Sequence, residues 1–167
     1  MSFTAKSSEV RRLDISPSDR IIVTYTPLVL RREITPQDPA FKRGIAKPRG
    51  LWYSCGRSWI RWTEAAEACT DWNYVYRLHL WYLALPTLLQ ISSRAQFEAF
   101  DQTFTRTLHG GPSIHYPDWL HVAEHYTGVE ICPYRKEYPP PIWYYTCDVA
   151  SGCIWDTNII HEVEQLL

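Results

Sequence analysis

Short stretches with strand and helix patterns follow one another in an irregular order, and this order restricts the possible folds most. Residues 20–31 (RIIVTYTPLVLR) are rich in β-branched and apolar side chains and predict a strand, whose second half Pro27 would confine to an edge or an end. Residues 58–70 carry Trp59 and Trp62 three positions apart, as on one face of a helix. Because the elements do not alternate in a regular β–α–β rhythm, we expect an α+β fold.

The other predicted elements are also short, and together they fit one domain. Ser93 with Gln96 three residues later is typical of a helix start. We expect residues 1–19 to be a flexible N-terminal segment and residues 20–167 to form a single domain. Further strands are expected over residues 50–54, 73–82, 87–91, 128–134, 142–149 and 151–156, and further helices over residues 92–104 and 117–125.

Composition narrows the cellular setting. A net charge of -1 does not predict long-range attraction to nucleic acid, although Lys42, Arg43, Lys47 and Arg49 form a local basic group. The five cysteines are odd in number and lack CxxC spacing, and the opening residues lack the apolar run of a secretory signal. No apolar run is long enough to span a membrane. We therefore expect a cytoplasmic protein with reduced thiols and no membrane partner.

The segment HVAEH places His121, Glu124 and His125 in the H-x-x-E-H pattern of one class of zinc peptidases. Histidines four residues apart share a helix face, and the glutamate could act as a base. However, a catalytic zinc needs a third protein ligand, and so short a pattern also arises by chance. We therefore assign no metal ligands and keep a zinc hydrolase as a minor alternative. A nucleophilic Cys55 is a further alternative to an ordinary buried cysteine.

The stretch GLWYS, which follows a Pro-Arg-Gly turn, allows two interpretations. Trp52 and Tyr53 would point to opposite sides of a strand, so one could join the core while the other lines a ligand cleft with Ser54 at its lip. Alternatively, all of these rings belong to the core. Glu130 stands in the apolar strand GVEI and would point away from the faces of its neighbours, either into solvent or into a site.

The order of four segments resembles the ADP-ribosyltransferase superfamily, particularly its small bacterial, toxin-like and phage-type members. The segments are TYTP, GLWYS, TLLQI with the following SSRAQFEAF, and GVEI, and the resemblance spans residues 21–155. It implies a central split, twisted and mainly antiparallel sheet flanked by short helices. It also implies an enzyme that uses NAD as its substrate, transfers ADP-ribose to a macromolecular acceptor and releases nicotinamide.

The resemblance further implies roles for individual residues. Glu130 would be catalytic, binding the ribose 2′-hydroxyl and stabilising the positive charge that develops as the glycosidic bond breaks. Tyr53 would stack on or edge the nicotinamide, and Ser54 would orient the site. The first strand would supply a further NAD contact. The candidate NAD-binding residues are thus Thr24, Tyr25, Thr26, Trp52, Tyr53 and Ser54.

Two departures from the family pattern keep a second function open. The arginine or histidine that the family carries on its first strand is absent from residues 24–26, so either a neighbouring group substitutes for it or the chain is a degenerate relative. Such a relative would be a non-catalytic module that binds a nucleotide, a nucleic acid or a protein on its aromatic side chains. In addition, Gly128 stands where arginine-modifying members carry Glu or Gln, which disfavours an arginine acceptor. Nucleic acid, another protein side chain or water stays open as the acceptor.

Overall fold

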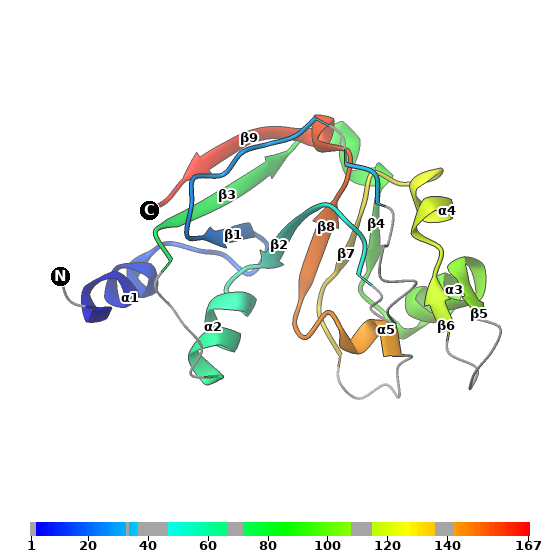
Figure 1. Cartoon of the computed structure of the whole chain (residues 1–167), viewed down its shortest axis with the longest axis horizontal. Coiled ribbons are helices and arrows are strands. Elements are labelled where there is room, and N and C mark those ends of the chain that lie inside the picture. Colours follow the sequence, from blue (N-terminus) through cyan, green and yellow to red (C-terminus); the bar gives the residue numbers. More distant parts are fainter. Residues whose placement is uncertain (1–2, 33, 37–46, 67–71, 108–114, 136–141) are drawn as a thin grey trace.

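A curled sheet of seven strands organises the fold (Figure 1). The computed structural model describes residues 3–32, 34–36, 47–66, 72–107, 115–135 and 142–167. The strand order is β4-β7-β8-β2-β1-β3-β9, and β4 and β7 form its parallel pair. This half-barrel with several short helices confirms the expected α+β class and the mainly antiparallel sheet. Its strands are β1 (Arg20–Thr24), β2 (Leu51–Cys55), β3 (Tyr74–Leu80), β4 (Leu88–Ile91), β7 (Gly128–Ile131), β8 (Ser151–Ile154) and β9 (Ile160–Gln165).

The helices lie in two groups, with α1 and α2 towards one end of the sheet and α3, α4 and α5 towards the other (Figure 1). A separate hairpin pairs β5 with β6. Within the described residues, none of the helices has the length and apolar character needed to cross a membrane. The remaining elements are α1 (Phe3–Arg12), α2 (Ser58–Ala65), η2 (Tyr82–Thr87), α3 (Arg94–Phe104), β5 (Thr105–Thr107), β6 (His115–Pro117), α4 (Trp119–Ala123), α5 (Ile142–Tyr145) and η3 (Thr157–Ile159).

Alternation along the strands gives the sheet an outer face covered by helices and an inner face inside the curl. On the outer face, Ile21 of β1 packs with Val10 of α1 and Ile60 of α2. The outer face of β7 packs against α3, α4 and α5 in a cluster rich in aromatic rings. The inner face holds a third cluster, built from Ile22, Tyr53, Tyr76, Leu78, Leu88, Ile154 and Ile159. Functional side chains on the inner face are therefore surrounded by the sheet itself.

The N-terminal residues differ from the flexible segment expected over residues 1–19. Residues 3–12 form α1, and Val10 is buried against the sheet. Arg57 anchors this helix by donating hydrogen bonds to the backbone carbonyls of Val10 and Leu13. A short polar sequence thus becomes ordered through tertiary contacts that local composition does not reveal.

Among the other elements, α3 confirms its predicted start and α5 corrects a prediction. Ser93 and Gln96 form a reciprocal capping box at the start of α3. In contrast, residues 142–149 were predicted to form a strand, and the structure has α5 and a turn there. Trp143 and Tyr144 are both buried although they are neighbours in sequence. A strand that covers one side of a core would bury only one of them, so packing overrides the β propensity of the rings.

Candidate functional site

Glu130 lies on β7, between β4 and β8, and points into the curl. Its neighbours Val129 and Ile131 are buried on the outer face, beneath the helices. The Glu130 side chain is only 12% exposed, so it does not simply face solvent. Of the two interpretations that alternation left open, the structure supports a carboxylate held by neighbouring side chains.

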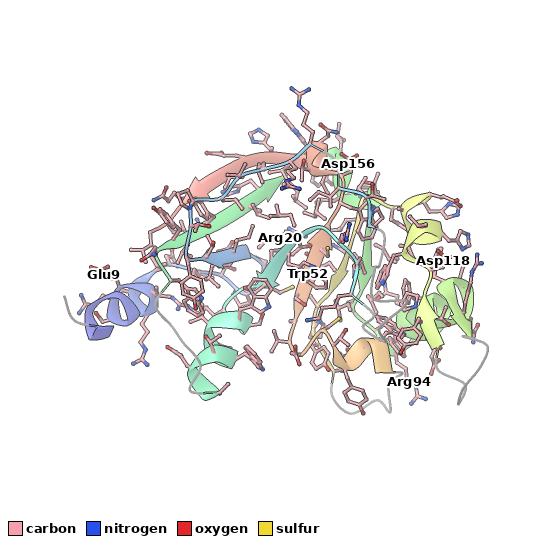
Figure 2. The ribbon with its side chains drawn as sticks, in the orientation of Figure 1. Glu9, Arg20, Trp52, Arg94, Asp118 and Asp156 are labelled. Carbon is pink, nitrogen blue, oxygen red and sulfur yellow. The ribbon has the colours of Figure 1, made fainter. Side chains whose placement is uncertain are left out.

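Two strands bring a cation and a phenol to this carboxylate. Arg20, from β1, lies near the centre of the sheet (Figure 2) and donates from Nε to Glu130 Oε2 over 2.8 Å and from Nη2 to Oε1 over 3.2 Å. Tyr53, from β2, donates its hydroxyl to Oε2 over 2.7 Å. The guanidinium also lies 5.9 Å from the centre of the Tyr53 ring. Such a two-pronged, charge-assisted contact fixes the plane as well as the position of the carboxylate.

Gly152 makes the contact between Tyr53 and Glu130 possible. In the register of the sheet, Gly152 of β8 pairs with Tyr53 on one side and with Glu130 on the other. The Tyr53 ring lies across this glycine, because a Cβ at residue 152 would come within 2.2 Å of the ring atom Cζ and 2.3 Å of the hydroxyl. A strand residue without a side chain is thus required for the phenol to reach across β8.

The two oxygens of Glu130 differ in how firmly they are held. Oε2 accepts the two short hydrogen bonds, from Arg20 Nε and the Tyr53 hydroxyl. Oε1 accepts the 3.2 Å bond from Arg20 Nη2 and a 3.4 Å contact from the amide of Gln90, an exposed residue on the parallel neighbour β4. Oε1 is therefore the oxygen that can exchange a weak partner for a ligand hydroxyl.

Burial and charge set the protonation states around Glu130. Burial lowers the pKa of Arg20, but the adjacent Glu130 charge contributes in the opposite direction and the net effect is a raised pKa. Burial, followed by the Glu130 charge, raises the pKa of Tyr53 well above its ordinary value. Arg20 therefore stays charged and Tyr53 stays protonated, so both act as hydrogen-bond donors across the physiological pH range.

Two cysteines complete the inner face near the site. Cys55 pairs with Arg20 in the sheet register, and Cys132 follows β7. A hydrogen bond between the two thiols raises the pKa of Cys55, which is buried, and lowers the pKa of Cys132. Cys132 is thus the better nucleophile of the pair, whereas the sequence had singled out Cys55.

The other residues that sequence predicted for NAD binding lie away from Glu130. Ser54 is fully buried on the outer face and donates its hydroxyl to the carbonyls of Ile21 and Gly56, so it is not at the lip of a cleft. Thr24, Tyr25 and Thr26 lie at the end of β1 opposite to Arg20, where the Thr24 hydroxyl donates to the Thr26 carbonyl. Alternation places Trp52 on the outer face, opposite to Tyr53.

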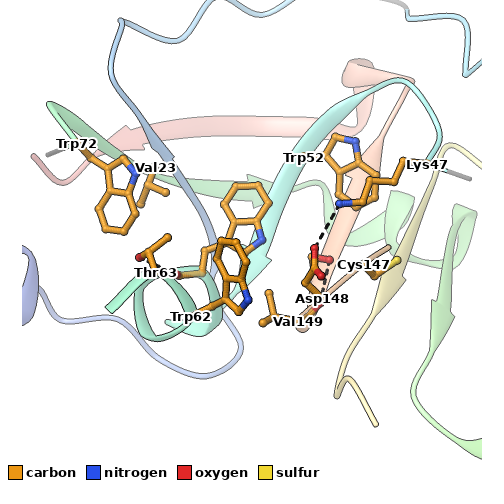
Figure 3. A pocket seen from close by; sticks show the side chains of 11 residues that line it. Val23, Lys47, Trp52, Trp62, Thr63, Trp72, Cys147, Asp148 and Val149 are labelled. Carbon is orange, nitrogen blue, oxygen red and sulfur yellow. Dashed lines mark hydrogen bonds and ion pairs between the residues drawn. The ribbon is translucent and has the colours of Figure 1, made fainter. Parts of the chain in front are cut away.

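Trp52 instead lines an apolar pocket of about 400 Å³ on the outer face, between α2 and the segment that follows α5. Figure 3 shows Trp72 and Trp52 at opposite ends of this pocket. Lys47 lies 5.5 Å from the centre of the Trp52 ring and 3.7 Å from a carboxylate oxygen of Asp148 at the rim. The aromatic walls of the pocket are Trp52, Trp59, Trp62 and Trp72.

Sequence reasoning missed Arg20, Gln90, Cys132 and Gly152 at the site. Arg20 opens an apolar strand, and alternation places it on the same face as Ile22, but nothing local pairs it with Glu130. Gly152 was a detectable signal, because a glycine inside a strand indicates close approach of another group. No protein-family model, curated protein or solved structure matches this chain.

Proposed function

We propose that this protein transfers ADP-ribose from NAD to an acceptor and releases nicotinamide, with Glu130 as the catalytic residue. One observation carries the proposal: Arg20, Tyr53 and Glu130 from three different strands converge on the inner face of the curled sheet. The family that the sequence resembles uses a first-strand arginine or histidine, an aromatic second-strand element and a later glutamate. Arg20 supplies the first-strand group that residues 24–26 lack.

The proposed reaction requires a fixed negative charge beside the reacting sugar. When the bond between ribose C1′ and the nicotinamide nitrogen breaks, nicotinamide leaves with the bonding electrons and positive charge develops on C1′ and the ring oxygen. The Glu130 carboxylate stabilises this charge because it is already oriented by Arg20 and Tyr53. The acceptor then forms a bond to C1′ and loses a proton.

The weakly held oxygen gives the ribose a place to bind. In this proposal the ribose 2′-hydroxyl donates to Oε1 of Glu130 and replaces the 3.4 Å contact from Gln90. Oε2 keeps its bonds to Arg20 and Tyr53 throughout, so the carboxylate does not have to reorient during the reaction. Because Gln90 is exposed, moving its side chain away from Glu130 gives up little buried surface.

Nicotinamide release from NAD by the purified protein tests the proposal. Glu130→Gln is expected to lower the rate by at least about 100-fold, because the preorganised charge is lost. Glu130→Asp keeps the charge but moves the carboxylate oxygens back towards the strand by one methylene group. A decrease in rate on the order of 100-fold is expected for this variant too. Glu162→Gln on β9 is the matched control, since the same change at an exposed strand residue should leave the rate unaltered.

Circular dichroism and thermal melting must show that each variant is folded. Full activity in folded Glu130→Gln, or no nicotinamide release from wild type with any acceptor, would refute the assignment. The acceptor screen begins with single-stranded nucleic acids and continues with protein side chains and water.

The tryptophan pocket supports a second candidate, a module that binds a planar ligand without turnover. Four indole rings around one apolar space provide stacking surfaces of the kind used for bases. A rise in melting temperature with NAD that is lost in Trp52→Ala but kept in Glu130→Gln, with no nicotinamide release, would favour this candidate.

A further inference from the structure

Helix α4 and the turn that follows it carry a cluster of metal-ligating side chains that the proposed reaction does not use. His121, Glu124 and His125 each offer one ligand atom, and these atoms all lie within 4.8 Å of one another. Within the described part of the chain, this is the one cluster of three or more histidine, cysteine or carboxylate groups close enough to share an ion.

The helix that presents the cluster is firmly anchored. Trp119 and Val122 are buried and fix one side of α4 against the core. Asp118 caps its start by accepting a hydrogen bond from the backbone of His121, and Arg106 pairs with the same carboxylate group. Positions 121, 124 and 125 therefore project together from the opposite side of the helix turn.

The imidazole rings are positioned by packing. Phe104 packs against both rings, with centroid separations of 5.1 Å to His121 and 6.1 Å to His125. The two histidine rings are 5.4 Å apart and inclined by 66°. Among the described residues, none forms a hydrogen bond or ion pair with the side chain of His121, Glu124 or His125. Their ligand atoms are thus available.

We propose that His121, Glu124 and His125 bind one divalent transition-metal ion, with zinc as the best-suited metal. Two imidazole nitrogens and one carboxylate oxygen are a common zinc donor set, and water would complete a tetrahedron. Glu124 is itself the third protein ligand that the H-x-x-E-H pattern alone lacked, and so it acts as a ligand rather than as a base. Binding would draw the donor atoms to about 3.3 Å from one another, which rotation of the exposed Glu124 and His125 side chains can supply.

Calorimetric titration with zinc chloride tests this site in the full-length protein after treatment with a chelator. Wild type is expected to bind one zinc ion, and His125→Ala and Glu124→Gln are each expected to weaken binding by on the order of tenfold or more. Both residues are exposed, so the variants should fold, as circular dichroism can verify. His79→Gln is the matched control, because His79 is an exposed histidine on β3 outside the cluster and its loss should leave zinc affinity unchanged.

Cobalt substitution identifies the donor atoms. A nitrogen and oxygen site gives visible ligand-field bands without the intense thiolate-to-cobalt absorption that cysteine ligands would add. The proposal is overturned if wild type binds no zinc, if His125→Ala and Glu124→Gln bind as tightly as wild type, or if the thiolate absorption appears.

Discussion

Replacing Gly152 with alanine should disrupt the candidate site, although Gly152 has no functional group of its own. The new Cβ would lie 2.2 Å from Tyr53 Cζ and 2.3 Å from the Tyr53 hydroxyl, far inside van der Waals contact. Tyr53 is fully buried, so its ring cannot move aside without displacing other core residues. The ring must therefore lift off β8 and release Glu130.

Two effects should lower the free energy of unfolding of Gly152→Ala. Overfilling a packed core costs roughly 1–3 kcal/mol. Loss of the 2.7 Å hydrogen bond from Tyr53 to a charged acceptor costs about 1.5–3 kcal/mol. A decrease of about 3 kcal/mol in the free energy of unfolding is a conservative expectation from the two. The midpoint of urea unfolding should fall by about 1.5 M for an m-value near 2 kcal/mol/M.

A double-mutant comparison isolates the cause. In a Tyr53→Leu background, the ring atoms that would meet the new Cβ are gone. Adding Gly152→Ala to that background should therefore lower the free energy of unfolding by less than about 0.5 kcal/mol. Urea unfolding of the four proteins measures both costs. An equal cost of Gly152→Ala in both backgrounds would show that the Tyr53 ring is not what the alanine displaces.

Three further predictions concern other parts of the chain. Iodoacetamide at pH 8 should modify Cys132, whose pKa is lowered, well before Cys147, whose pKa burial raises to about 12, and equal rates by peptide mass spectrometry would contradict this. A hydrogen bond from His79 lowers the pKa of Glu164 in the folded protein. The ionised Glu164 therefore stabilises the fold above about pH 4.3, and this stabilisation is lost as the pH falls through the lowered pKa of the folded state. Glu164→Gln should flatten the acid side of a plot of melting temperature against pH. Ser93→Ala removes a helix cap and should cost about 1 kcal/mol in urea unfolding, whereas no change would mean that the capping box is not formed in solution.

Local patterns predicted the parts of the fold that depend on neighbouring residues. The GVEI strand, with Val129 and Ile131 buried and Glu130 on the other face, follows from alternation alone. The start of α3 follows from the reciprocal bonds of Ser93 and Gln96. In both cases, the physical cause lies within four residues and can be read directly.

The composition of the site depends on strand order, which local patterns do not contain. Arg20 and Glu130 are 110 residues apart and belong to strands that are separated by β2 and β8. Only the curl of the sheet, together with a glycine on β8 that lets Tyr53 cross, brings them together. The sequence therefore indicated Glu130 and Tyr53 as candidates but placed the first-strand contact at residues 24–26, which lie at the end of β1 opposite to Arg20.

Variants of the Arg20 and Glu130 ion pair test whether it belongs to a functional site or is a structural contact. The two side chains are 17% and 12% exposed, so desolvation offsets much of their mutual attraction and the pair adds little net stability. Removing only the cation, in Arg20→Met, should lower the free energy of unfolding by about 3–5 kcal/mol, because the buried Glu130 charge is left without its counter-charge. Replacing both, with Arg20→Met and Glu130→Leu, should recover part of this loss and leave the protein about 1.5–3 kcal/mol less stable than wild type, because the buried Tyr53 hydroxyl also loses its acceptor. On the proposed function, this double variant should release no nicotinamide. If the double variant were instead as unstable as Arg20→Met, the pair would be needed for folding, and its convergence with Tyr53 would no longer support a catalytic role.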